Sequence, residues 1–201
     1  MKKSFSIQLL ILANLVPLAG VMFFGWSLFA IMLLFWLENV IIGIVNIFKI
    51  INAEGKIVKD KYKITLNNKK IEDLAKMSAI PLALFFCFHY GMFTFVHGVF
   101  IFALFSKTGS LGIGVLWGTL ALMISHAYSY YANFIGKEEY KKLSRADVMA
   151  APYKRVVVLH LTIIFGAFAA SALGSPVFAL VTLIFIKTLV DLWSHIKEHK
   201  I

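Results

Sequence analysis

The chain has 201 residues, of which 60% are hydrophobic and 15% are charged, and its mean hydropathy is +0.84. This composition excludes a soluble globular domain and indicates a polytopic membrane protein. The formal net charge is +10. However, the basic residues form no groove interleaved with aromatic residues, so we expect no nucleic-acid partner. The single cysteine, Cys87, excludes an intramolecular disulfide framework.

Six apolar segments approach the length of about 20 residues that a helix needs to cross the hydrocarbon core of a bilayer. Residues 1–201 are therefore expected to form a single transmembrane domain, an all-α bundle of six membrane-spanning helices. The first segment is expected to be retained, because no small-residue cleavage site follows it. The predicted spans are 5–24, 27–50, 77–105, 112–135, 153–173 and 177–196.

Lysine and arginine residues concentrate in two long connections, 51–76 and 136–152, and near the two ends of the chain. By the positive-inside rule, both connections and both termini are expected in the cytoplasm. The basic connections would then face the anionic lipids of the inner leaflet, which are the partners we expect.

Local patterns predict some structure within these two connections. Connection 51–76 has an alternating apolar pattern that ends at Leu66. This pattern is compatible with a short strand and with a segment that lies at the lipid headgroups. Connection 136–152 has a helical pattern, and we expect an interfacial cytoplasmic helix there. Ser144 followed three residues later by Asp147 resembles a capping box, which would start a helix.

Ionisable side chains inside the predicted spans are the candidates for function, because such groups are costly in hydrocarbon and need a partner. Counting about 1.5 Å per residue from the cytoplasmic boundary places these candidates at depths of about 7 to 18 Å. We expect the five of them to surround one cavity in the inner half of the membrane. They are Glu38 and His89 (deepest), His126, His160 and Asp191.

His97 lies about 12 Å further out than His89 on the same predicted helix and is turned by about 80° from it. It is therefore expected in a second layer or on an outward path. Lys187 and Asp191 could form an internal ion pair instead of having a functional role. His195 could be a residue at the helix end whose side chain reaches toward the membrane surface. The other polar residues expected to line the interior are Asn39, Tyr90, Tyr130, Lys187 and His195.

Imidazole and carboxylate groups together suit a divalent transition metal ion, of which zinc is our first choice. The predicted ligands are His89, His126, His160 and Asp191, with Glu38 as a further ligand or as a general base. Such a site within the membrane would suit a metal-dependent hydrolase of a lipid or lipid-linked substrate. No HExxH motif is present, so the convergence of these ligands is inferred from depth alone.

Two other classes of function stay open. The chain could be a channel or carrier for a metal ion or for protons, with His97 on the outward half of the path. It could also be a non-catalytic scaffold whose histidines bond between helices, at about 0.6 kcal/mol for each hydrogen bond. The sequence leaves open the substrate, the choice between enzyme and transporter, and the oligomeric state, including a dimer.

On three stretches the chain resembles a family of small prokaryotic integral membrane proteins that is classed as a domain of unknown function. The resemblance covers most of the predicted spans and places the protein in the cytoplasmic membrane of a prokaryote. It implies no assigned activity. The stretches are Trp36-Leu37-Glu38-Asn39, His89-Tyr90-Gly91 with His97-Gly98, and Pro152-Tyr153-x-Arg155 ending at His160.

Overall fold

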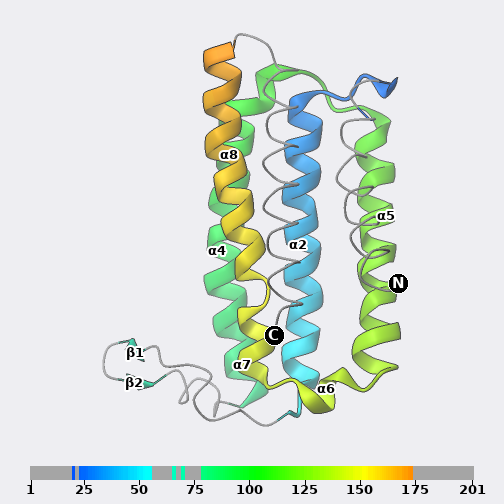
Figure 1. The fold of residues 1–201 in the computed structure, drawn as a ribbon, viewed down its shortest axis with the longest axis vertical. Coiled ribbons are helices and arrows are strands. Elements are labelled where there is room, and N and C mark those ends of the chain that lie inside the picture. Colours follow the sequence, from blue (N-terminus) through cyan, green and yellow to red (C-terminus); the bar gives the residue numbers. More distant parts are fainter. Residues whose placement is uncertain (1–19, 21–22, 56–64, 67–68, 71–77, 174–201) are drawn as a thin grey trace, which may run out of the picture. The chain divides into compact units, whose positions relative to one another are not determined.

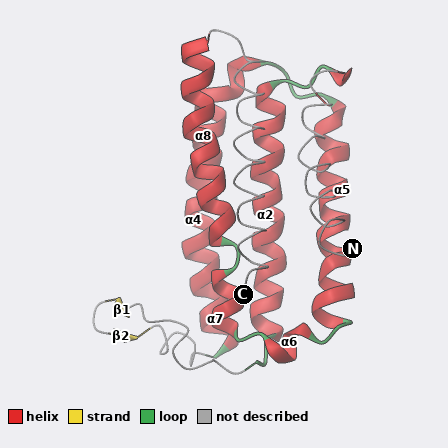
Figure 2. Cartoon of the chain, in the orientation of Figure 1, coloured by secondary structure: helices red, strands yellow, loops and turns green. Residues whose placement is uncertain are grey.

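A computed structural model describes residues 20, 23–55, 65–66, 69–70 and 78–173 of the chain (Figure 1). This part is helical except for loops and one short hairpin (Figure 2). In the hairpin, β1 (Thr65–Leu66) pairs antiparallel with β2 (Lys69–Lys70). The long helices are α2 (Leu28–Asn52), α4 (Ala79–Phe105), α5 (Ile113–Ser129) and α8 (Tyr153–Leu173), and the short ones are α6 (Glu139–Lys142) and α7 (Arg145–Ala150).

Four predicted spans are confirmed as helical: α2, α4 and α8 begin and end within two residues of their spans, and α5 reaches the end of its span only together with the π-helical segment that follows it. A 3-10 turn, Ser106–Thr108, follows α4, and a π-helical segment, Tyr130–Ile135, continues α5. The predicted spans 5–24 and 177–196 lie outside the described residues. Three described segments are long and apolar enough to cross a membrane: Leu28–Asn52, Ala79–Thr108 and Arg145–Gly166.

The chain divides into two compact units. Unit 1 holds the described residues of Met1–Trp36, His97–Trp117 and Val157–Ile201, and unit 2 holds those of Leu37–Val96 and Gly118–Val156. Each unit has its own cluster of buried apolar side chains, and each long helix contributes residues to both units. The cores and the polar groups are therefore described unit by unit.

The core of unit 1 joins the first turns of α2 to α4 and α8. Ser27 caps α2, since its Oγ accepts a hydrogen bond from the Ala30 amide at 3.1 Å. Gly98 lets α4 come close to α2, because a Cβ at this position would lie 2.9 Å from the Trp36 ring. The buried members of the cluster are Leu28, Phe29, Ile31, Met32, Phe35, Ile101, Phe105, Leu159 and Ile163.

The core of unit 2 joins α2, α4, the π segment, α7 and the start of α8. The buried Asn46 side chain donates to the Val148 carbonyl at 3.1 Å, which ties α2 to α7. Past the end of α2, the Gly55 amide donates to the Leu143 carbonyl at 3.1 Å. The buried members of the cluster are Ile50, Ala53, Leu82, Ala83, Phe86, Tyr90, Phe134, Val148 and Val156.

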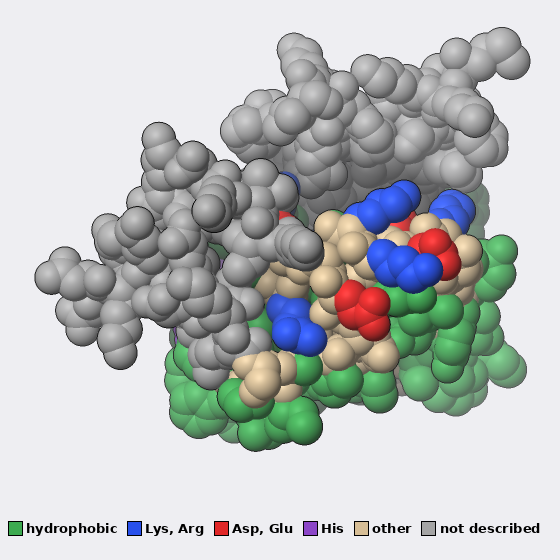
Figure 3. Space-filling model, turned by 90° about the horizontal axis from the view of Figure 1, so that it is seen from below, with side chains coloured by type: hydrophobic (Ala, Val, Ile, Leu, Met, Phe, Trp, Pro, Cys, Tyr) green, Lys and Arg blue, Asp and Glu red, His purple; other side chains and the backbone are tan. Residues whose placement is uncertain are grey.

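The segment predicted as one interfacial helix contains two short helices, α6 and α7. Ser144 is confirmed as the N-cap of α7, because its Oγ accepts a hydrogen bond from the Asp147 amide at 3.2 Å; its hydroxyl also donates to Asp147 Oδ2 at 2.6 Å. A hydrogen bond from Lys141 lowers the pKa of the exposed Glu138 carboxyl. Figure 3 shows basic and acidic side chains together on the face seen from below, beside apolar ones.

The approach of α4 to α2 in unit 2 depends on Gly43, which is buried. A Cβ at this position would lie 2.6 Å from the Tyr90 ring, and that ring is itself only 3% exposed. We expect Gly43→Ala to cost about 1–3 kcal/mol of overpacking, against about 1 kcal/mol gained in helix propensity. Thermal unfolding in detergent measures the net change.

Gly91→Ala is the matched control for this prediction. A Cβ at Gly91 meets nothing within 4 Å, although this glycine also lies inside a long helix. Gly91→Ala should therefore keep or raise the unfolding temperature, while Gly43→Ala lowers it relative to that control. Equal temperatures for the two variants would contradict the importance of the close contact.

Candidate functional site

Glu38 lies on α2, in a helix that contains no other acidic residue. Its Oε1 accepts a hydrogen bond from Arg155 Nη1 at 2.9 Å, and Arg155 lies in the first turn of α8. The guanidinium compensates the negative charge of the carboxylate, which would otherwise be costly in so apolar a helix. The ion pair thus links α2 to α8 within unit 2.

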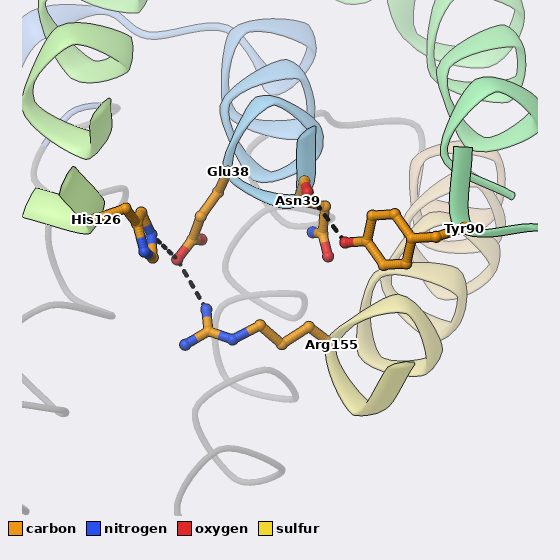
Figure 4. Close-up of polar contacts among 5 residues, drawn as sticks. All are labelled: Glu38, Asn39, Tyr90, His126 and Arg155. Atoms are coloured by element: carbon orange, nitrogen blue, oxygen red, sulfur yellow. Dashed lines mark hydrogen bonds and ion pairs between the residues drawn. The ribbon is translucent and has the colours of Figure 1, made fainter. Parts of the chain in front are cut away.

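His126, on α5, faces the same carboxylate. Its Nε2 lies 3.7 Å from Glu38 Oε1, which is longer than a direct hydrogen bond. The side chains of Glu38 and His126 are 21% and 22% exposed, whereas that of Arg155 is 55% exposed. One carboxylate oxygen therefore lies between an imidazole and a guanidinium from two other helices (Figure 4). We call Glu38, His126 and Arg155 the Glu38 centre.

Tyr90 and Asn39 pack beside the Glu38 centre. The Tyr90 hydroxyl donates to the backbone carbonyl of Asn39 at 3.0 Å, and the Thr94 hydroxyl donates to the Tyr90 carbonyl at 2.9 Å. The side chains of Tyr90, Asn39 and Thr94 are all buried. These contacts hold α4 against α2 next to Glu38, so Asn39 and Tyr90 position the helices that carry the centre.

His89 also lies in unit 2, but its contact is with α8 rather than with Glu38. Its Nδ1 is 2.7 Å from the Tyr153 hydroxyl. The ring stacks on Phe85, with centroids 5.5 Å apart, and meets the edge of Phe93 at 5.2 Å. Two aromatic contacts and a hydroxyl partner at Nδ1 thus hold this imidazole in place within unit 2.

His97 and His160 form a pair in unit 1. His97 Nε2 lies 3.0 Å from His160 Nδ1, and the two rings are perpendicular. His97 is 4% exposed, whereas His160 is exposed. One hydrogen bond between two imidazoles needs one ring to donate and the other to accept, so the tautomers of the two rings are linked.

The histidines predicted to be metal ligands have different partners in the structure: His126 lies near Glu38, His89 near Tyr153 and His160 near His97. No group of three or more His, Cys, Asp or Glu side chains among the described residues could hold a metal ion. The Tyr130 hydroxyl accepts a hydrogen bond from Asn52 at 3.2 Å. Lys187, Asp191 and His195 lie outside the described residues.

Sequence reasoning missed two partners, Arg155 and Tyr153. From the sequence, Glu38 is expected to be a further metal ligand or a general base, and no cation is named as its partner. The position of Arg155 three residues inside the predicted span 153–173 was a usable signal, because a cation inside a span is itself costly and seeks an acid. Tyr153 carried no comparable signal, since aromatic residues are common at helix starts near a membrane surface.

A comparison with protein families matches residues 1–201 to a family of unknown function (DUF6498). The chain belongs to this family. The match spans the whole sequence and confirms the resemblance to a domain of unknown function. Searches among proteins of curated function and among solved structures found no match. The arrangement of the side chains is therefore the basis for any functional conclusion.

A double-mutant cycle measures the energetic link between Glu38 and Arg155. We expect a coupling free energy of about 0.5–1 kcal/mol between Glu38→Gln and Arg155→Gln. The two side chains form a direct ion pair, but solvent screens it because the Arg155 side chain is 55% exposed. Glu38→Gln with Lys137→Gln is the control cycle, since Lys137 bonds to Asn133 instead. A coupling no larger than in this control would show that the ion pair does not stabilise the fold.

Proposed function

We propose that the chain is an integral membrane protein that crosses the prokaryotic cytoplasmic membrane six times, with both termini in the cytoplasm. Three described segments long and apolar enough to cross a membrane support the membrane location. The distribution of Lys and Arg supports the orientation. We further propose that the protein is a proton channel or carrier, and that the Glu38 centre takes part in the transfer.

One observation carries this proposal: Glu38 Oε1 faces both the Arg155 guanidinium and the His126 imidazole. Histidine and carboxylate are the side chains most often used to pass protons within membranes. At 3.7 Å, a small movement or one bridging water would bring His126 Nε2 and Glu38 Oε1 within reach of proton transfer. In the transfer, an imidazolium at His126 would pass its Nε2 proton to the carboxylate, leaving a neutral imidazole and a neutral acid.

Arg155 makes this centre a poor site for a metal ion. The guanidinium is permanently charged and already bonds to Glu38, so a divalent cation on the same carboxylate would be repelled at close range. The other described histidines have a tyrosine or a second histidine as partner. Proton transfer needs pairs of this kind, whereas a catalytic zinc site needs three ligands around one point.

Proton flux into vesicles tests the proposal. The protein is reconstituted in liposomes that contain a pH-sensitive dye, and a potassium diffusion potential drives protons inward. We expect wild-type flux above that of protein-free liposomes and a loss of at least tenfold in Glu38→Gln, because the amide cannot accept the proton. Glu54→Gln is the control, since Glu54 is exposed beyond the end of α2 and should leave the flux unchanged.

Wild-type flux no greater than that of empty liposomes would overturn the proposal. Equal flux in Glu38→Gln and wild type would remove Glu38 from the path. Arg155→Gln adds a second readout, because the flux should fall if charge compensation at Glu38 matters. Each variant is first checked for an unchanged elution volume and for an unfolding temperature above that of the assay, so that a misfolded protein is not mistaken for an inactive one.

The metal-dependent hydrolase stays a prediction with its own test. Elemental analysis of protein purified in mild detergent, without added metal or a histidine tag, is compared with a triple His89/His126/His160→Ala variant. On the proton proposal we expect the same metal content in both, far below one ion per chain. Near-stoichiometric metal in the wild type that is lost in the triple variant would reverse our preference and direct assays to lipid hydrolysis.

A further inference from the structure

Unit 1 contains a cavity of about 400 Å³ where α2 and α5 begin. This volume is within the range of cavities that hold small organic ligands, which is about 300–1,000 Å³. Its walls come from the turn before α2, from Ala30 in the first turn of α2, and from residues at the start of α5. The lining residues are Phe24, Gly25, Trp26, Ser27, Ala30, Ser110, Gly112, Ile113, Gly114, Val115 and Trp117.

Close backbone contacts shape the walls of this cavity. Gly25 has a φ of +63°, which allows the turn that leads into α2. Gly114 brings the start of α5 against Trp26, because a Cβ there would lie 2.6 Å from the indole Nε1. The Ser27 hydroxyl donates to the Ser110 carbonyl at 3.0 Å, which joins the two walls. The cavity is thus bounded by fixed backbone contacts as well as by side chains.

Most of the side chains that line the cavity are apolar, and two serines, Ser27 and Ser110, add polar atoms to its wall. No acidic or basic side chain occurs among the described residues that line the cavity. The Ser27 Oγ is already engaged, since it donates to Ser110 and accepts from the Ala30 amide. Three aromatic rings, Phe24, Trp26 and Trp117, line the cavity. These rings, with the aliphatic side chains of Ile113 and Val115, suit a hydrocarbon ligand.

The rim of the cavity is exposed and apolar. Phe24 is 74% exposed, Ile113 is 71% exposed and Trp117 is 64% exposed. Aromatic side chains at the end of a membrane-spanning helix lie among the lipid headgroups and the upper acyl chains. In a bilayer, this rim would therefore meet lipid directly, and a chain could enter the cavity sideways.

We propose that the cavity binds the acyl chain of a membrane phospholipid. The proposal rests on the membrane location given under "Proposed function", but it does not depend on proton transfer at the Glu38 centre. Because the surrounding lipid is itself apolar, binding would rely on van der Waals contacts of the chain with lining residues such as Trp26 and Val115. The site would hold one lipid at the junction of α2 and α5.

Quenching of Trp26 fluorescence by brominated acyl chains tests the proposal. The background variant keeps Trp26 as its single tryptophan, with Trp36, Trp117 and Trp193 changed to Phe. It is reconstituted in phosphatidylcholine vesicles whose acyl chains are brominated or unmodified. We expect brominated chains to reduce the Trp26 emission at least twofold, because a chain in the cavity would lie against the half-buried indole.

Filling the cavity supplies the decisive comparison. Val115→Phe enlarges a lining residue and should remove most of the quenching. Leu116→Phe is the matched control, because Leu116 is the next residue on α5, is 54% exposed and does not line the cavity. If Val115→Phe lowers the unfolding temperature, Ala30→Val fills the cavity from the α2 wall and is used for the same comparison.

Quenching that is lost in the cavity-filling variant and kept in Leu116→Phe would support the site. No quenching in the background variant, or equal quenching in Val115→Phe and Leu116→Phe, would overturn it. Proton flux of Val115→Phe is measured in parallel. A failed lipid site leaves the effect of Glu38→Gln on flux intact, and a failed proton proposal leaves the quenching intact, so the two failures are distinguishable.

Discussion

The negative charge of Glu38 is the constraint on which the arrangement of unit 2 depends. A carboxylate in a helix as apolar as α2 is stable only when another group compensates its charge. Arg155 does so at 2.9 Å, with His126 facing the same oxygen. Because these partners come from α8 and α5, the pairing requires the three helices to meet at the level of Glu38.

Helix packing next to Glu38 is set by one small residue and one large one. Gly43 leaves room for the Tyr90 ring, and the Tyr90 hydroxyl reaches the carbonyl of Asn39. Unit 1 repeats the device with Gly98 and the Trp36 ring. Association of helices in lipid lacks a strong hydrophobic force and relies on such close packing. The polar centre is therefore supported by van der Waals contacts as much as by charge.

The histidines divide into different environments, and this division bears on function. His126 faces a charged pair, His89 contacts aromatic rings and a tyrosine hydroxyl, and His97 and His160 contact each other. A relay of protons needs groups that can both accept and donate a proton; the contact of His89 with the tyrosine hydroxyl and that of His97 with His160 are within hydrogen-bond distance, and His126 lies 3.7 Å from Glu38. Their separation into two- and three-residue contacts is what favours protons over a metal ion in our proposal.

Sequence alone determined the bounds of α2, α4 and α8 to within two residues, because an apolar run of spanning length bounded by charges leaves few alternatives for the backbone. It did not show that the predicted span 112–135 changes from α-helix to π-helix after Ser129. It also singled out Glu38 and the histidines, since ionisable groups are rare and costly in such runs. Only the tertiary structure decided their partners: Arg155 for Glu38, Tyr153 for His89, and His97 for His160. Depth along a helix follows from counting residues, but the partner depends on helix rotation and close packing, which residues far apart in the sequence set together.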